Sequence, residues 1–185
     1  LPGIFKTNLE TIPPPPDFRI EPNPEIDSFF SGVPRPRIGL AWKGSETNRP
    51  GKRRSCPDEH ILNLMRAAGH IQFVSLQVDG AEIPGAGGRL HRVENLVHDM
   101  TDTAAVLQHL DLVISIDTLT GHLAGSLCRP TWLMLPYAAD WRWLQNRHDS
   151  PWYPRHTLFR QPAQDDWSSV MRRITAHLAA EFPAA

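Results

Sequence analysis

The sequence predicts an α/β fold in which helices flank a mostly parallel sheet. Short apolar runs, typical of buried strands, alternate along the chain with segments whose apolar residues recur at helical spacing. Strands that alternate with helices form βαβ units, and these units give parallel sheets. The chain of 185 residues is long enough for one domain with its own hydrophobic core.

Six strands and four main helices are expected. The apolar runs predict strands at 37–42, 71–76, 90–93, 112–116, 131–135 and 157–159, and the helical patterns predict helices at about 57–69, 102–110, 118–127 and 166–180. The runs at 37–42, 71–76 and 112–116 are the most apolar, so we expect these strands at the centre of the sheet. Parallel sheets of this kind bind ligands at the carboxyl ends of their strands.

The first 36 residues differ in composition from the rest. They hold nine of the 18 prolines, including the run 13–16. Proline is costly inside helices and central strands. We therefore expect an extended arm at 1–36, with a short helix near 24–30, and a Rossmann-like domain at 37–185.

Composition excludes several classes of protein. Lys and Arg number 19 against 20 Asp and Glu, a net charge of −1, which argues against a nucleic-acid-binding protein. The apolar runs are too short to cross a bilayer. Only two cysteines are present, Cys56 and Cys128, which is too few for a disulfide scaffold, and the nine histidines lack the spacing of a metal site. The start of the chain lacks a signal-peptide pattern, so we expect a cytoplasmic protein without a bound metal or cofactor.

The strongest candidate for a binding site follows the strand at 112–116. Asp117, Thr118 and His122 come at a strand-to-helix turn, where free backbone N–H groups suit a phosphate or a sugar hydroxyl. The alternative is that Asp117 and Thr118 only cap the helix and that His122 packs one turn later.

Two further segments are expected at the same edge of the sheet. The basic loop 49–55, which includes Arg54, precedes a helix and can hold a diphosphate; alternatively it is a solvated loop. The aromatic segment after the strand 131–135 includes Trp141 and Arg142, which either wall a crevice or shield the core.

Together these segments resemble the C-terminal half of family 9-type glycosyltransferases, which include the lipopolysaccharide heptosyltransferases. The likeness is strongest to members that carry N-terminal tetratricopeptide repeats. It rests on 39–44 (GLAWKG), 73–77 (FVSLQ), 111–118 (DLVISIDT), 122–125 (HLAG) and 140–143 (DWRW). Heptosyltransferases usually have glycine after Asp-Thr, whereas this chain has Leu119, so ADP-heptose is not assumed as the donor.

The resemblance implies the donor-binding half of a GT-B glycosyltransferase that is inverting and metal-independent and uses a nucleotide-diphosphate sugar. Matched position by position, the donor-binding residues are Gly44, Ser45, Arg54, Gln77, Asp117, Thr118 and His122. The family's general base lies in its N-terminal domain, so this chain is expected to be inactive alone and to act with that domain, and with tetratricopeptide repeats in the full-length protein. The alternatives are half of a GT-B-related nucleotide-sugar epimerase, or a non-catalytic protein-interaction module.

Overall fold

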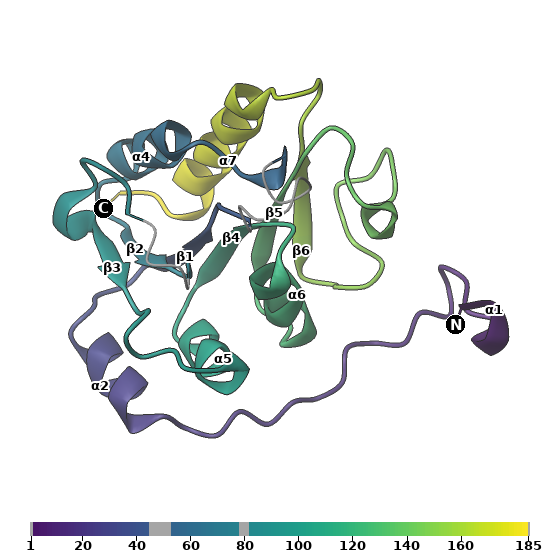
Figure 1. Cartoon of the computed structure of the whole chain (residues 1–185), viewed down its shortest axis with the longest axis horizontal. Coiled ribbons are helices and arrows are strands. Elements are labelled where there is room, and N and C mark those ends of the chain that lie inside the picture. The colour runs from purple at the N-terminus through teal and green to yellow at the C-terminus, as the bar shows by residue number, and fades with distance from the viewer. Residues whose placement is uncertain (1, 45–52, 78–81, 185) are drawn as a thin grey trace.

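The protein is built around a six-stranded parallel sheet (Figure 1). The computed structural model describes residues 2–44, 53–77 and 82–184. The strands are β1 (Arg37–Ala41), β2 (Gln72–Ser75), β3 (Leu90–Arg92), β4 (Leu112–Ile116), β5 (Thr131–Leu135) and β6 (His156–Arg160). Every neighbouring pair is parallel. The predicted fold class is confirmed.

The strand order β3-β2-β1-β4-β5-β6 creates a switch point between β1 and β4. The chain proceeds outward from β1 to β3 and then returns to form β4 on the other side of β1, so the loops after β1 and β4 diverge and leave a crevice. Gly39 in β1 permits close packing here, because a Cβ at this residue would lie 2.6 Å from Leu110 Cδ1 and 2.7 Å from Leu76 Cδ1.

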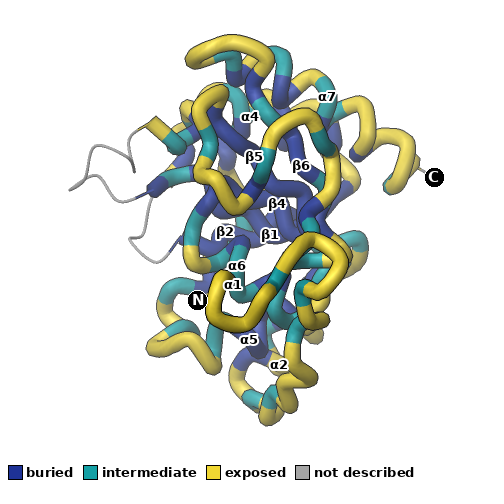
Figure 2. Tube along the Cα trace, turned by 90° about the vertical axis from the view of Figure 1, so that its right-hand side faces the viewer, coloured by how far each residue is buried: buried dark blue, intermediate teal, exposed yellow. Residues whose placement is uncertain are grey.

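Helices cover both faces of the sheet (Figure 1). On one face lie α4 (Asp58–Ala67) and α7 (Trp167–Glu181), and on the other lie α2 (Pro24–Ser31), α5 (Met100–Gln108) and α6 (Leu119–Ser126). Buried residues concentrate in the strands and on the inner faces of these helices (Figure 2). None of the helices in the described part of the chain combines the length and apolarity needed to cross a membrane.

One helix begins earlier than the sequence predicts. Asp99 is the N-cap of α5, and its Oδ1 accepts hydrogen bonds from the backbone N–H groups of Thr101 (2.7 Å) and Asp102 (3.0 Å). Asp102, where the sequence predicts the helix to begin, accepts a hydrogen bond of 2.8 Å from Asn23 Nδ2. Its carboxylate thus joins α5 to the N-terminal segment.

The N-terminal 36 residues have two different parts. Residues 6–23 contain no helix or strand, and α1 (Pro2–Phe5) before them stands away from the sheet (Figure 1). The expected short helix is confirmed as α2, which starts at Pro24 behind the N-cap Asn23. Its Ile26 and Phe30 are buried against α5, so this part of the segment contributes to the core.

Candidate functional site

Two cavities open at the carboxyl ends of the strands. A cleft of about 680 Å³, called here the large cleft, is lined by Arg53, Arg54, Asp117, Pro136, Tyr137, Ala138, Ala139, Asp140, Gln161, Gln164 and Asp165. A cavity of about 210 Å³, called the small pocket, is lined by Ala41, Lys43, Gly44, Leu76, Gln77, Met100, Thr103, Thr118, Leu119, Thr120 and Leu123. Asp117 lines the first and Thr118 the second, so the two cavities meet where β4 ends.

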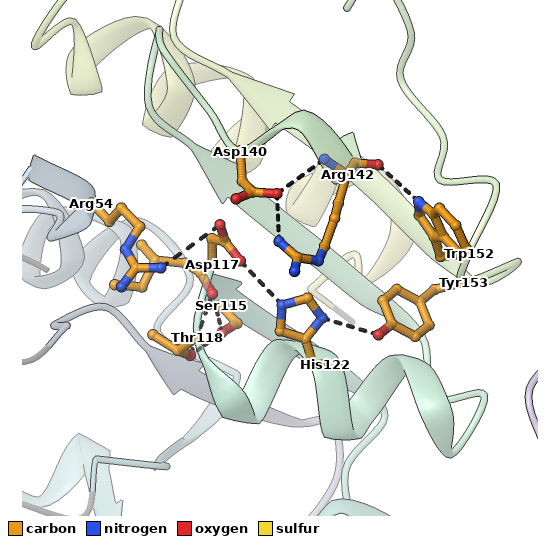
Figure 3. A network of polar contacts seen from close by, with 10 residues as sticks. Arg54, Ser115, Asp117, Thr118, His122, Asp140, Arg142, Trp152 and Tyr153 are labelled. Atoms are coloured by element: carbon orange, nitrogen blue, oxygen red, sulfur yellow. Dashed lines mark hydrogen bonds and ion pairs between the residues drawn. The ribbon is translucent and has the colours of Figure 1, made fainter. Parts of the chain in front are cut away.

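Asp117 is the centre of the polar network between them (Figure 3). Its Oδ1 lies 3.3 Å from His122 Nε2, and its Oδ2 lies 3.8 Å from Arg54 Nη1. Burial acts to raise the pKa of this carboxyl, but His122, the nearby Trp143 indole and the charge of Arg54 outweigh it and hold the pKa below its usual value. Asp117 is therefore a carboxylate at neutral pH.

Arg54 lines the large cleft and stays partly exposed despite this ion pair. Its contact with Asp117 is longer than a hydrogen bond, and its buried Nε has no hydrogen-bond partner among the residues described. Hydrogen bonds join the residues before and after the segment 45–52. Gly44 N donates to Ser55 Oγ (3.0 Å), and Cys56 N donates to Trp42 O (2.9 Å). Arg54 thus projects from an anchored position into the large cleft.

Thr118 forms the N-cap of α6 without capping it through its side chain. Its hydroxyl lies 3.4 Å from Ile116 O and 3.4 Å from Ser115 Oγ, and no described side chain caps this helix end through its backbone N–H groups. The first-turn N–H groups lie beside the small pocket, which Leu119 and Thr120 line. A helix start of this kind favours an anion.

His122 is held between aromatic rings. Its ring stacks on Trp143 with centroids 5.3 Å apart, and its Nδ1 lies 3.0 Å from the Tyr153 hydroxyl oxygen (Figure 3). Both ring nitrogens therefore have partners inside the protein. His122 lines neither cavity, whereas Asp117 lines the large cleft and Thr118 the small pocket.

Gln77 also acts through other residues. Its Oε1 accepts hydrogen bonds from the backbone N–H groups of Trp42 (2.9 Å) and Lys43 (3.0 Å), and its Nε2 donates to Lys43 O (3.3 Å). The side chain links the end of β2 to the loop that leaves β1. Gly44 in that loop lines the small pocket, whereas Ser45, the other residue expected there, lies outside the described residues.

Trp141 and Arg142 lie in η2 (Trp141–Trp143), directly after Asp140 of the large cleft. The Arg142 guanidinium lies 4.9 Å above the Trp141 ring and donates to Asp140 Oδ1 (2.7 Å). Trp141 is 63% exposed, whereas Trp143 is buried in the core. The tryptophans of this segment therefore leave the cleft open.

Gln161 and Tyr137 are among the residues of the large cleft that the sequence did not single out. Gln161 follows β6 directly, and its Oε1 accepts a hydrogen bond of 3.0 Å from Tyr137 N, which joins the loops after β5 and β6. The rule that placed Asp117 at the end of β4 also applies to a polar residue after the last strand, and it could have identified Gln161. Within the described ranges, no group of three or more His, Cys, Asp or Glu side chains could hold a metal ion.

Comparisons with known proteins place the fold. No protein-family model matches the sequence. Protein FlbA of Caulobacter vibrioides is 30% identical over 153 residues, which cover 78% of this chain and 25% of FlbA. Among solved structures, E. coli ADP-heptose lps heptosyltransferase II has a TM-score of 0.61 at 13% identity, covering 90% of this chain and 54% of that one. The chain has the fold of a GT-B glycosyltransferase domain.

Two other solved structures agree. E. coli heptosyltransferase WaaC with ADP has a TM-score of 0.53 at 17% identity, over 89% of this chain and 49% of that one. The glycosyl transferase family 9 structure from Veillonella parvula has a TM-score of 0.53 at 13% identity, over 85% of this chain and 46% of that one. The chain thus spans about half the length of these structures and a quarter of FlbA.

Proposed function

We propose that this chain binds the nucleotide-diphosphate sugar donor of a glycosyltransferase, as the C-terminal half of a GT-B enzyme. The observation that carries the proposal is the meeting of Arg54, Asp117 and the start of α6 at the switch point of the sheet. The solved structures of similar fold are heptosyltransferases, one of them with ADP, which supports the same choice.

The diphosphate is assigned to the start of α6 and to Arg54. The first-turn N–H groups of α6 carry partial positive charge, and the guanidinium of Arg54 adds a full charge with hydrogen-bond donors in a planar fork. Arg53 lines the same wall of the large cleft. These groups supply the positive charge that a departing nucleoside diphosphate needs, so the proposed transfer is metal-independent.

The two ends of the donor are assigned to the two cavities. The small pocket presents the exposed apolar side chains of Met100 and Leu119, which suit the flat face of a nucleobase. The large cleft presents the carboxylates of Asp117 and Asp140 and the amide of Gln164, which suit sugar hydroxyls. The diphosphate then crosses the boundary between the cavities, beside Thr118.

Transfer with inversion also needs a base for the acceptor hydroxyl. We assign this base to a separate N-terminal domain, as the resemblance to family 9-type enzymes implies. We also propose that the full-length protein carries tetratricopeptide repeats. The epimerase alternative predicts that this fold converts one nucleotide sugar into another without an acceptor. The interaction-module alternative predicts that no nucleoside diphosphate binds.

A thermal-shift panel of UDP, ADP and GDP, followed by calorimetry, tests the proposal. Ligand at a hundred times its dissociation constant should stabilise the chain by about 2.7 kcal/mol. Arg54→Ala should weaken binding about 10- to 150-fold, the range for a lost charged hydrogen bond of about 1.5–3 kcal/mol. Arg66→Ala is the matched control, because Arg66 is exposed in the last turn of α4. Binding of none of the three nucleotides, or equal affinity in Arg54→Ala, would refute the proposal.

A further inference from the structure

The hydroxyl of Tyr153 completes a chain of contacts that ends at the cleft. Asp117 Oδ1, His122 and Tyr153 lie in line, with 3.3 Å between Asp117 and His122 Nε2 and 3.0 Å between His122 Nδ1 and the tyrosine oxygen (Figure 3). Asp117 comes from the end of β4, His122 from α6 and Tyr153 from the loop before β6. Three separate elements thus meet at one imidazole ring.

The chemistry of the three groups fixes where the protons lie. A carboxylate only accepts hydrogen bonds, so the nitrogen that faces Asp117, Nε2, carries a proton. In the neutral ring Nδ1 is then bare, and the Tyr153 hydroxyl donates to it. Burial raises the pKa of Tyr153, so its proton is present throughout the physiological range.

A second contact also determines the orientation of the ring. A single hydrogen bond to Asp117 would allow the imidazole to turn about its axis, whereas partners on both nitrogens make such a turn cost a hydrogen bond. Tyr153 is itself fixed by close packing on α6: a Cβ at Gly125 would lie 2.5 Å from the Tyr153 ring. Its backbone N–H donates to Ser150 Oγ (3.3 Å). The hydroxyl is therefore presented from a rigid position.

We infer that Tyr153 is a positioning residue, which keeps the ring proton of His122 on Nε2 and so holds the Asp117 carboxylate in place in the large cleft. This inference rests on the proposed function, because it takes Asp117 as a ligand-facing group. It assigns a function to a residue of the aromatic segment that does not line either cavity. Simple core packing is the alternative, and it requires the ring of Tyr153 but not its hydroxyl.

Tyr153→Phe separates these two roles, because it keeps the ring and removes only the hydroxyl. The first readout is the ¹⁵N spectrum of the His122 ring without ligand. We expect Nε2–H in the wild-type chain, with Nδ1 shifted by its hydrogen bond, and a clear change of the Nδ1 resonance in the variant. The second readout is affinity for UDP-glucose, ADP-glucose and GDP-mannose, which should fall about 3- to 10-fold, the range for a lost neutral hydrogen bond.

Trp152→Phe is the matched control. It lies next to Tyr153 in the same loop and loses one hydrogen bond, from Trp152 Nε1 to Arg142 O (3.0 Å), without touching His122. This variant should keep the wild-type His122 spectrum and the wild-type affinity.

The outcomes distinguish the two hypotheses. Failure of the wild-type chain to bind any nucleotide sugar refutes the proposed function, whereas the ligand-free spectrum still tests the Tyr153 contact. A Tyr153→Phe chain in which either the spectrum or the affinity is unchanged overturns the positioning role. If that variant does not fold, the wild-type spectrum decides, because a His122 ring protonated only at Nδ1 would contradict the inference.

Discussion

His156, at the start of β6, is buried beneath the site. Its ring is stacked on Trp143 with centroids 6.0 Å apart, and neither ring nitrogen has a well-aligned hydrogen-bond partner among the residues described. Burial lowers the pKa of this imidazole to about 4, although the backbone at Gly121 partly offsets the effect. At neutral pH the side chain is therefore an uncharged ring that contributes mainly through packing.

This residue should make the stability of the protein depend on pH. The unfolded chain takes up the proton near the ordinary pKa of 6.5 and the folded chain only near 4. The free energy of unfolding contributed by His156 therefore falls as the pH drops from about 6.5 to 4, by about 3 kcal/mol in total. His156→Phe keeps a stacked ring without a titrating group, so its stability should change less over this range. Urea unfolding between pH 4.5 and 7.5 measures the difference.

The control for that experiment is His148→Phe, because His148 is exposed. It should keep the wild-type pH dependence. Parallel curves for the wild-type chain and His156→Phe would mean that His156 is protonated in the folded state at the same pH as in the unfolded state.

At the scale of elements, the site depends on how α6 packs against the loop before β6. His122 and Gly125 are three residues apart in α6 and therefore lie on the same side of the helix. His122 contacts Asp117, and Gly125 packs against the loop before β6. Gly125 is closely surrounded: a Cβ there would lie 2.5 Å from the Tyr153 ring and 2.7 Å from His156 Cε1. The small residue allows the loop to approach α6 closely enough for the Tyr153 hydroxyl to reach His122.

Gly125→Ala should therefore destabilise the protein. Overpacking of a filled core costs about 1–3 kcal/mol, which opposes the gain of about 1 kcal/mol that alanine brings inside a helix. We expect a net loss in thermal unfolding, together with weaker nucleotide binding. Gly69→Ala is the control, because a Cβ there meets no atom within 4 Å. An alanine at 125 that raises the melting temperature would show that the loop and α6 are not tightly packed.

A second link between elements joins β2 to the loop after β1. Gln77 uses both ends of its amide on the backbone of Trp42 and Lys43, and Asp58 at the start of α4 accepts from Trp42 Nε1 (2.7 Å) and Lys43 Nζ (2.9 Å). The loop is thus held from the sheet and from the following helix. This fixation positions Lys43 and the adjacent Gly44, which line the small pocket.

At the scale of the whole molecule, the two cavities lie on one edge, and the large exposed apolar side chains of residues 82–184 lie there too. Met100 and Leu119 line the small pocket, Tyr137 lines the large cleft, and Trp141 follows Asp140 of that cleft; each is more than half exposed. A ligand or a second domain that covers this edge would remove these side chains from water, which is favourable.

The proposed function predicts binding without turnover for this chain alone. Half of a two-domain site lacks the groups that exclude water and activate the acceptor. Calorimetry should detect nucleoside-diphosphate binding, and chromatography of incubations with nucleotide sugars should detect no sugar transfer or interconversion. Transfer to an added acceptor would place the base in this chain, and conversion of one nucleotide sugar into another would favour the epimerase alternative.

The sequence by itself determined the class of the fold and the edge on which the candidate site lies. Apolar runs such as 112–116 can be buried on both faces only as interior strands, and in a parallel sheet their carboxyl ends share one edge. That rule alone brings Arg54 and Asp117 together across 62 intervening residues, and the structure places them 3.8 Å apart.

The tertiary structure decided which side chains line the two cavities and which support others. His122 and Gln77 lie at the predicted edge, but their polar atoms are bonded to Tyr153, Asp117 and the loop after β1. Local pattern does not reveal such partners, because they come from segments distant in the sequence and depend on how the side chains pack. The burial of α2 has the same origin: its helical start is visible in the sequence, whereas the surface of α5 that covers Ile26 and Phe30 exists only in the folded chain.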